Sequence, residues 1–151
     1  MAQVALSSAI IAVIAAVSAM LGGHHANEAM LEQMRANDDW AFFQAKGIKA
    51  ALVESKLELL AALAREPKVD DHEKVAEYRK SQKELEEKAH EEEASSRTHM
   101  ARHGVLSRAV TTSQVAIALS AISVLTRKKW IWFVALAFGA VGGVLLATSF
   151  V

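Results

Sequence analysis

The chain has 151 residues, 52% of them hydrophobic, so it forms one domain or one compact membrane unit. It has no cysteine, which excludes disulfides and thiolate metal sites, and its formal net charge of zero argues against nucleic-acid binding. The region from His24 to Arg108 holds all 17 acids, all six histidines and all but three of the 17 basic residues, so both ends are nearly uncharged.

The first predicted element is a membrane-spanning helix over residues 2–21. This segment has no ionisable side chain, and a helix of about 20 apolar residues crosses the ~30 Å hydrocarbon core of a bilayer. A cleaved signal peptide is the alternative. Signal peptides usually begin with basic residues and have an apolar core of about 7–15 residues. This segment has a longer apolar run with no basic residue before it, so we expect an uncleaved span.

Residues 22–108 are predicted to form a helical hairpin outside the membrane. Gly22 and Gly23 are expected to end or bend the first span, and Asn27 can cap the helix that follows. The first hairpin helix is expected over residues 27–66, which contain neither proline nor a loop cluster.

Pro67 marks the turn of this hairpin, because proline lacks an amide hydrogen and clashes with the preceding helical turn. Asp70 then serves as an N-cap, and Glu73, three positions further on, completes a capping box. The second hairpin helix is expected over residues 71–108, and it can continue into the next span without a break.

Apolar residues of the first hairpin helix alternate at spacings of four and three, interrupted only by Ser55. This spacing forms a seam along one side of a helix, on which we expect the second helix to pack. The seam of the second helix is poor, because Gln82, Glu92 and Ser96 interrupt it. The second helix is too polar to be stable alone. We therefore expect it to pack against the first helix in an antiparallel, coiled-coil-like hairpin. The seam residues are Ala41, Ala45, Ile48, Leu52, Leu59 and Ala62 on the first helix and Val75, Tyr78, Leu85 and Ala89 on the second.

Two further spans are predicted at residues 109–126 and 130–151, separated by the basic loop 127–129. Short basic loops usually remain in the cytoplasm. We therefore place this loop and the N-terminus in the cytoplasm and residues 22–108 on the outer side. The opposite orientation is favoured by three arginines close to the second span: Arg97, Arg102 and Arg108.

The third span carries small residues at every fourth position, with a G-x-x-x-G motif at the centre. Such a face lets helix backbones approach closely, within one subunit or between subunits. Gln114 is the most polar residue of the second span, and its amide is expected to pack inside the protein rather than face lipid. The predicted packing face of the third span consists of Ala135, Gly139, Gly143 and Ala147.

One stretch of the first hairpin helix has aromatic and other apolar side chains around most of its circumference. A single partner helix cannot cover such a surface, so we expect a second contact, with another copy of the chain. The alternative is that these side chains only pack on the second hairpin helix. The candidate contact residues are Trp40, Phe42, Phe43, Gln44, Lys46 and Lys49.

This stretch, ANDDWAFFQAKGIK, together with RHGVLSRAVTTSQVAIALSAISVLTRKKWIWFVALAFGAVGG, resembles an uncharacterised family of bacterial membrane proteins, classed as a domain of unknown function. The motif that marks the resemblance is W-A-aromatic-aromatic-Q-A-K-x-I-K, from Trp40 to Lys49, with Gly47 where a serine is expected. The resemblance covers nearly the whole chain. It implies a bacterial inner-membrane protein and supplies no activity.

Four histidines are weak candidates for a metal or pH-sensitive site. His99 and His103 are four residues apart and share one face of a helix, while His24 and His25 leave the first span on the same side. Four imidazoles can bind zinc or copper, or change charge near pH ~6.5. The alternative that we favour is solvated histidines, because no acid stands at a metalloprotease spacing. We therefore expect no cofactor.

These patterns predict an all-α membrane protein with three transmembrane helices and a long extramembrane helical hairpin. The sequence has no glycine-rich phosphate loop, no nucleophile elbow and no pair of acids recognisable as a general acid and base, so we expect no enzymatic activity. The expected role is a scaffold that forms a homo-oligomer in the lipid bilayer, with an unidentified protein partner as a further option. The alternatives are a metal- or pH-responsive accessory subunit and a channel lined by Thr112, Gln114, Ser120 and Ser123.

Overall fold

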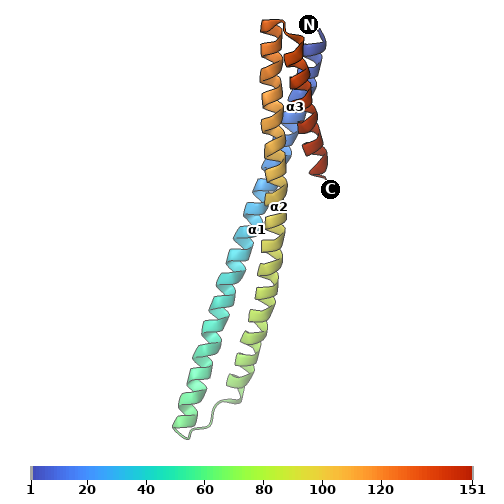
Figure 1. Ribbon diagram of the computed structural model, residues 1–151. Coiled ribbons are helices and arrows are strands. Elements are labelled where there is room, and N and C mark those ends of the chain that lie inside the picture. Colours follow the sequence, from blue (N-terminus) through green and yellow to red (C-terminus); the bar gives the residue numbers. More distant parts are fainter. Residues whose placement is uncertain (1, 151) are drawn as a thin grey trace. The chain divides into compact units, whose positions relative to one another are not determined.

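The computed structural model describes residues 2–150, apart from the side chain of Val69, and this part of the chain is all-α without any strand. Its helices are α1 (Ala2–Ala62), α2 (Val69–Thr126) and α3 (Lys129–Thr148) (Figure 1). The predicted all-α class is therefore confirmed. Each of the three helices contains a segment long and apolar enough to cross a membrane.

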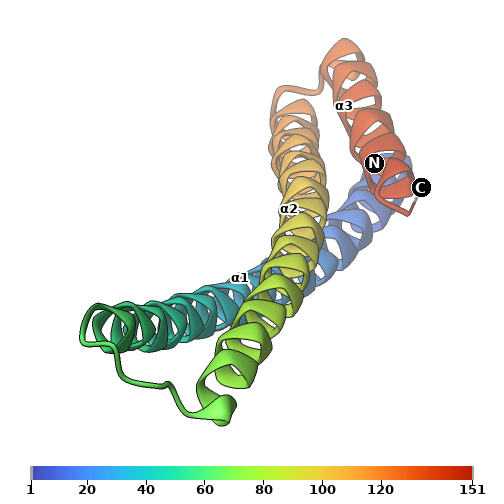
Figure 2. The same ribbon diagram turned by 90° about the horizontal axis from the view of Figure 1, so that it is seen from below.

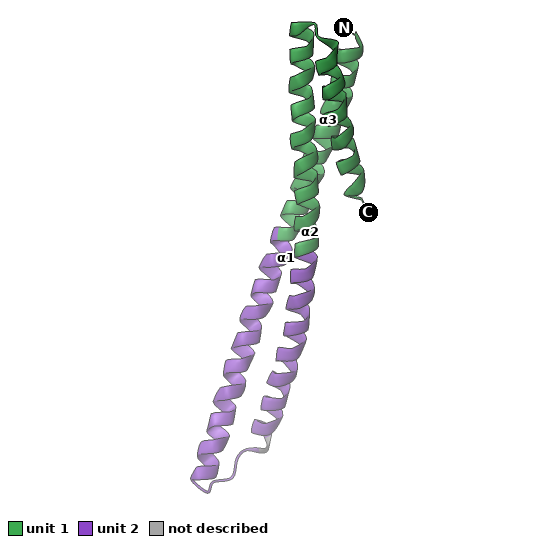
Figure 3. Cartoon of the chain, viewed as in Figure 1, with its two compact units in different colours: residues 1–29, 97–151 green, residues 30–96 purple. Residues whose placement is uncertain are grey.

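The chain divides into two compact units, which Figure 3 shows in different colours. Unit 1 comprises Met1–Ala29 and Arg97–Val151, and unit 2 comprises Met30–Ser96. Unit 1 contains the first part of α1, the last part of α2 and all of α3. Unit 2 contains the remaining parts of α1 and α2 and the loop between them.

Helix α1 does not end at Gly22 and Gly23, and Asn27 does not cap a new helix as predicted, because α1 is continuous from Ala2 to Ala62. Gly22 is buried, and a Cβ atom placed on it would lie 3.4 Å from Cβ of Leu106 in α2. The two helices are therefore close at this position, where a Cβ atom would make an ordinary van der Waals contact.

Unit 1 is built around small side chains. The buried residues of α2 in this unit alternate at spacings of three and four, which is the pattern of a tightly packed helical seam. Several of them are serines, whose small side chains also let helices approach closely. The buried residues are Leu106, Ala109, Ser113, Ala116, Ser120 and Ser123.

Helix α3 packs on both other helical segments of unit 1 through glycine. A Cβ atom on Gly139 would lie 2.6 Å from Cδ1 of Ile11 in α1. A Cβ atom on Gly142 would overlap the hydroxyl of Ser113 in α2 and lie 3.3 Å from the carbonyl oxygen of Ala109. Two glycines in successive turns thus allow close contact with two different neighbours.

Unit 2 is an antiparallel pair of helical segments closed by the loop 63–68, which joins their ends in the foreground of Figure 2. The predicted seam of α2 is confirmed, because its members are buried or half-buried. The predicted seam of α1 is wrong, because all six of its members are exposed: Ala41, Ala45, Ile48, Leu52, Leu59 and Ala62. The face of α1 that contacts α2 instead includes Ala36, Asp39, Phe43, Ala50, Val53, Leu57 and Leu60.

The polar character of α2 explains this choice of face. Its side chains need charged and hydrogen-bonding partners, and α1 offers them on the less apolar face. The guanidinium of Arg79 donates two hydrogen bonds to Oε1 and one to Oε2 of Glu54, at 2.9–3.3 Å. Nζ of Lys88 lies 2.9 Å from Oδ2 of Asp39. Pairing with the polar partner thus prevails over burial of the more apolar α1 face.

Helix α1 ends at Ala62 rather than at the predicted Glu66. The amide of Arg65 donates to the carbonyl of Leu60 at 2.9 Å, and the amide of Ala64 donates to the carbonyl of Ala61 at 3.1 Å. These bonds form a Schellman motif, in which the residue after the helix adopts the left-handed conformation. Ala64 is that residue, with φ of 51°.

Replacing Ala64 by glycine is expected to stabilise the folded chain by about 1 kcal/mol, because a Cβ atom disfavours the left-handed conformation. The free energy of unfolding, measured in detergent by denaturant titration, checks this. Ala61→Gly is the matched control, since Ala61 is helical and exposed and should lose about 0.5–1 kcal/mol. Equal losses at both positions would contradict the assignment of the Schellman motif.

Candidate functional site

Three of the six candidate contact residues face the second helix of their own hairpin. Nε1 of Trp40 donates to Oε1 of Glu93 at 2.9 Å. The same indole packs edge-on against Phe43 and His90, with ring centroids 5.4 and 5.1 Å apart. Nζ of Lys46 lies 5.2 Å from the centroid of a tyrosine ring of α2. These three residues therefore pack within their own hairpin, as the alternative interpretation of the sequence had it.

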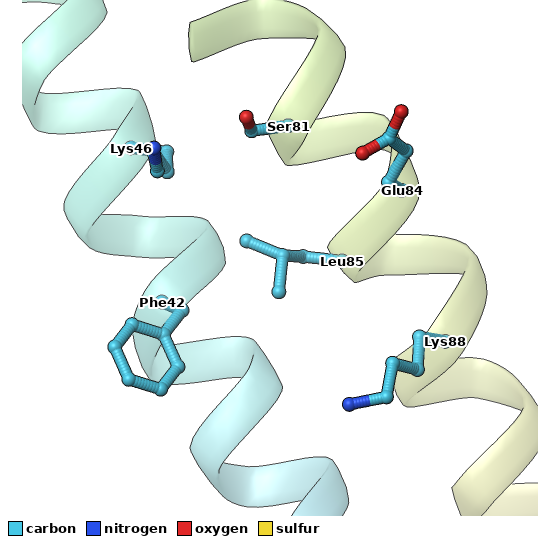
Figure 4. Close-up of a pocket in the computed structure, with 6 residues that line it drawn as sticks. All are labelled: Phe42, Lys46, Ser81, Glu84, Leu85 and Lys88. Carbon is cyan, nitrogen blue, oxygen red and sulfur yellow. The ribbon is translucent and has the colours of Figure 1, made fainter.

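The other three candidates, Phe42, Gln44 and Lys49, are exposed. The Phe42 ring is 61% exposed and lies at the edge of a shallow groove between the two helices of unit 2. In this groove the side chain of Leu85 points from α2 toward α1 (Figure 4). Charged and hydroxyl side chains border it: Lys46, Ser81, Glu84 and Lys88.

Gly47, which stands where the resembled motif has serine, leaves room for an interhelical hydrogen bond. A Cβ atom on Gly47 would lie 2.6 Å from Nε2 of Gln82. That amide nitrogen donates to the carbonyl oxygen of Phe43 at 3.2 Å. A side chain at position 47 would therefore displace Gln82.

Two ion pairs with nearly buried carboxylates hold the register of the hairpin. The ammonium group of Lys88 donates to Asp39, and this hydrogen bond raises the pKa of Lys88. Near the loop, Nζ of Lys56 donates to Oδ2 of Asp71 at 2.6 Å, which lowers the pKa of that carboxyl. Breaking either pair would leave a nearly buried carboxylate without its cation, which is strongly destabilising. The two pairs therefore fix how α1 and α2 are aligned.

The predicted packing face of α3 is divided. Ala135 and Gly139 are buried within unit 1, and Gly143 is half-buried, with Cδ1 of Ile14 at 3.7 Å from a Cβ placed on it. Ala147 is exposed. The buried stripe turns instead to Gly142, because a spacing of four residues drifts around a helix that has 3.6 residues per turn.

The prediction that Gln114 packs inside the protein is wrong for a single copy of the chain, because this residue is exposed on unit 1. The buried stripe of α2 passes through its neighbour Ser113, and each residue along a helix is rotated by about 100° from the one before. Sequence reasoning also missed Ser18 and Ser113 as buried residues. The three-four spacing of small residues along α2 was the signal for the second of these.

The four histidines lie together in unit 1, and two of them are in direct contact. Nδ1 of His25 lies 2.8 Å from Nδ1 of His99, so one ring must donate its proton to the other. The ring of His24 lies beside that of His25, with centroids 5.6 Å apart. His103 donates from Nδ1 to the carbonyl oxygen of Gly22 at 2.9 Å. Within residues 2–150, no three histidine or acidic side chains are arranged to hold a metal ion.

Burial and the positive charges of His99, Arg102 and His24 lower the pKa of His25 below 6.5. The carboxylate of Glu28 has a weaker, opposite effect on this pKa. We therefore expect His25 to titrate below pH 6.5 in an NMR pH titration of the histidine rings. The folded form binds protons less readily than the unfolded form, so its stability is full above pH 6.5. Stability is lost as the pH falls toward the lower pKa of the folded state.

His99→Ala should raise the pKa of His25, because it removes a neighbouring ring that can carry positive charge. The matched control is His72→Ala, which changes an exposed histidine of unit 2. A pKa of His25 at or above 6.5 in the unmodified chain would contradict the geometry of this pair.

These features define an all-α protein whose three helices are each long and apolar enough to span a membrane. The chain belongs to the family described as Domain of unknown function (DUF4337), which matches residues 1–151. This membership confirms the resemblance to an uncharacterised family and assigns no activity. No curated protein and no solved structure matches the chain.

Proposed function

We propose that this protein is an integral membrane scaffold that self-associates and has no catalytic role. The observation that carries the proposal is the exposure of large apolar side chains on both units. In unit 1, Leu6, Val13 and Phe133 are each at least 60% exposed, as expected of side chains that face lipid. In unit 2, Ile48 and Leu52 are 62% and 66% exposed in a highly charged segment. Such an apolar surface outside a membrane is typical of a protein contact.

The proposed location is a bacterial inner membrane, with the loop 127–129 in the cytoplasm. The three consecutive basic residues of this loop support the orientation, and the resemblance described under the sequence supports the choice of a bacterial membrane. In this arrangement residues 30–96 lie in water on the outer side.

The position of Gln114 supports contacts between copies within the bilayer. An exposed amide within an apolar span is costly in lipid and gains hydrogen-bond partners at a helix interface. The channel alternative is less favoured, because Ser120 and Ser123 are buried inside unit 1. They are therefore not available to line a path between copies.

Native mass spectrometry after gentle extraction into nanodiscs tests the proposal, with the metal content measured on the same sample. We expect a defined homo-oligomer without bound metal. A monomer, or a stoichiometric complex with a different protein, would overturn self-association. A ring of five or more copies that conducts ions would replace the scaffold with the channel.

A further inference from the structure

A cavity lies in unit 1 where the basic loop 127–129 connects α2 to α3. Its volume is about 490 Å³, within the range of ~300–1,000 Å³ that is usual for ligand pockets. The start of α1, the last turn of α2 and the start of α3 form its wall at the end of unit 1 where the N-terminus lies (Figure 1). Its lining includes Val4, Val124, Arg127, Lys129, Trp132 and Phe133.

The two basic side chains of this cavity have no acidic residue near them in the sequence of unit 1. The two segments of this unit contain a single acid, Glu28. Glu28 is 24 residues after Val4 on α1, which is a rise of about 36 Å along the helix. In the hairpin, by contrast, acids balance basic residues such as Arg79 and Lys88. The cavity therefore carries a positive charge that suits an anionic ligand.

The backbone conformation of Arg127 gives a second indication. Its φ is 55°, which is the left-handed conformation that glycine adopts without strain and other residues adopt at a cost. Glycine would form the same turn more easily, so the turn does not require an arginine. Residues held in such conformations often serve a function, and here the side chain of Arg127 lines the cavity.

Hydrogen bonds hold the loop and one wall of the cavity in place. The hydroxyl of Ser123 and the amide of Ile131 both donate to the carbonyl oxygen of Lys128, at 3.1 and 3.2 Å. Nε1 of Trp132 donates to the hydroxyl of Ser7 in α1 at 3.1 Å. The site is thus formed before a ligand binds.

A mostly apolar groove of about 360 Å³ continues from the cavity along α1 and α2. The groove and the cavity share Val4 and Val124. From there the groove follows the apolar segment of α2 through Ala121 to Ile117. A positively charged cavity followed by an apolar groove matches a molecule with an anionic head and a hydrocarbon chain. A free anion such as inorganic phosphate would leave the groove unused.

We propose that this cavity binds an anionic phospholipid, with the phosphate between Arg127 and Lys129 and an acyl chain in the groove. A guanidinium group binds phosphate through parallel hydrogen bonds, and an ammonium group adds a point charge. Basic pockets between membrane-spanning helices hold anionic headgroups in this way. The aromatic side chains of Trp132 and Phe133 are typical of the membrane–water interface. This proposal rests on the membrane location proposed above and does not depend on self-association.

Native mass spectrometry of the full chain in detergent tests the choice of lipid. Equal amounts of dioleoyl phosphatidylglycerol and dioleoyl phosphatidylcholine are added, which have the same acyl chains but differ in net charge. We expect the chain to retain at least about tenfold more phosphatidylglycerol, because two cations contact its phosphate and its net charge is negative. Equal retention of the two lipids would overturn the proposal.

Charge-removing variants test the site. Lys129→Gln and Arg127→Gly should each lower the retention of phosphatidylglycerol about fivefold or more. Arg127→Gly also relieves the left-handed conformation, so misfolding does not account for its loss of lipid. Lys128→Gln is the matched control, because it removes the same charge from the loop while the lining of the cavity stays the same. An equal loss in all three variants would show a general attraction to the loop and overturn the cavity as the site.

Two further measurements test whether the ligand is a lipid rather than a free anion. Ala121→Phe fills the groove and should lower the retention of phosphatidylglycerol, whereas Ala140→Phe, at an exposed position of α3, should not. Excess inorganic phosphate should leave the lipid bound. Displacement of the lipid by inorganic phosphate, or unchanged retention in Ala121→Phe, would overturn the acyl chain in the groove.

The outcomes separate this proposal from the proposed scaffold. A chain that spans the membrane but retains no phosphatidylglycerol would overturn the lipid site and leave the membrane scaffold standing. A monomer that retains phosphatidylglycerol selectively would overturn self-association and support the lipid site.

Discussion

Gly139→Ala is expected to destabilise unit 1 by about 1–3 kcal/mol, the range for overpacking a well-packed core. The added Cβ atom would lie 2.6 Å from Cδ1 and 2.8 Å from Cγ1 of Ile11. Ile11 is 4% exposed and β-branched, so its stem cannot rotate away easily. Helix α3 must therefore move away from α1. Denaturant-induced unfolding in detergent, followed by circular dichroism, measures the loss.

Gly143→Ala is the matched control, because it changes the second glycine of the same G-x-x-x-G motif. A Cβ atom there would lie 3.7 Å from Cδ1 of Ile14, which is an ordinary contact. The variant should be as stable as the natural chain or more stable by up to about 1 kcal/mol, because alanine favours helix more than glycine does. Equal destabilisation by Gly139→Ala and Gly143→Ala would contradict the packing of α3 on α1 described above.

Trp40→Ala is expected to destabilise the hairpin of unit 2 by about 2–3 kcal/mol, somewhat less than the loss for a fully buried tryptophan. The change removes the edge-on contacts with Phe43 and His90. It also removes the hydrogen bond of 2.9 Å to Glu93. Amide hydrogen exchange of residues 30–96 measures the effect locally, and protection of both helices should fall together.

Phe42→Ala provides the comparison, since Phe42 is the adjacent aromatic residue but is 61% exposed. Its removal should change hydrogen-exchange stability by no more than about 0.5 kcal/mol. It should instead weaken association between copies, because Phe42 is an exposed apolar residue of unit 2. Loss of protection as large as that of Trp40→Ala would contradict the assignment of Trp40 to the face of α1 that contacts α2 and of Phe42 to the exposed surface.

Helical content, membrane-length apolar segments and the seam of α2 could be predicted from the sequence, because each depends on local composition or on spacing along one helix. The face of α1 that contacts α2 could not. Two faces of α1 share the same spacing, and the choice between them depends on polar partners such as Lys88 and Arg79, which lie on the other helix. An apolar pattern alone therefore selected the wrong face.

The candidate residues divide for a similar reason. Sequence reasoning recognised Trp40 and Phe42 as parts of one aromatic segment, but their environments differ because residues two apart on a helix point in nearly opposite directions, about 160° apart. The close approach at Gly142 depends on Ser113 and Ala109 of another helix. The contact of His25 with His99 at 2.8 Å depends likewise on how two helices align. Such pairings depend on geometry that is absent from a single sequence.

Thiol labelling of single-cysteine variants in sealed and permeabilised membrane vesicles tests most directly whether three segments span the bilayer while residues 30–96 lie in water. Ile10→Cys, Ile122→Cys and Val141→Cys are suitable, because all three native side chains are exposed in the folded chain. Only lipid or another copy can protect them. We expect these thiols to resist a water-soluble maleimide until the membrane is dissolved, while Gln33→Cys and Lys83→Cys react once the reagent reaches their side. Rapid labelling of the first three thiols in vesicles that are permeabilised but not dissolved would contradict a membrane-spanning unit 1.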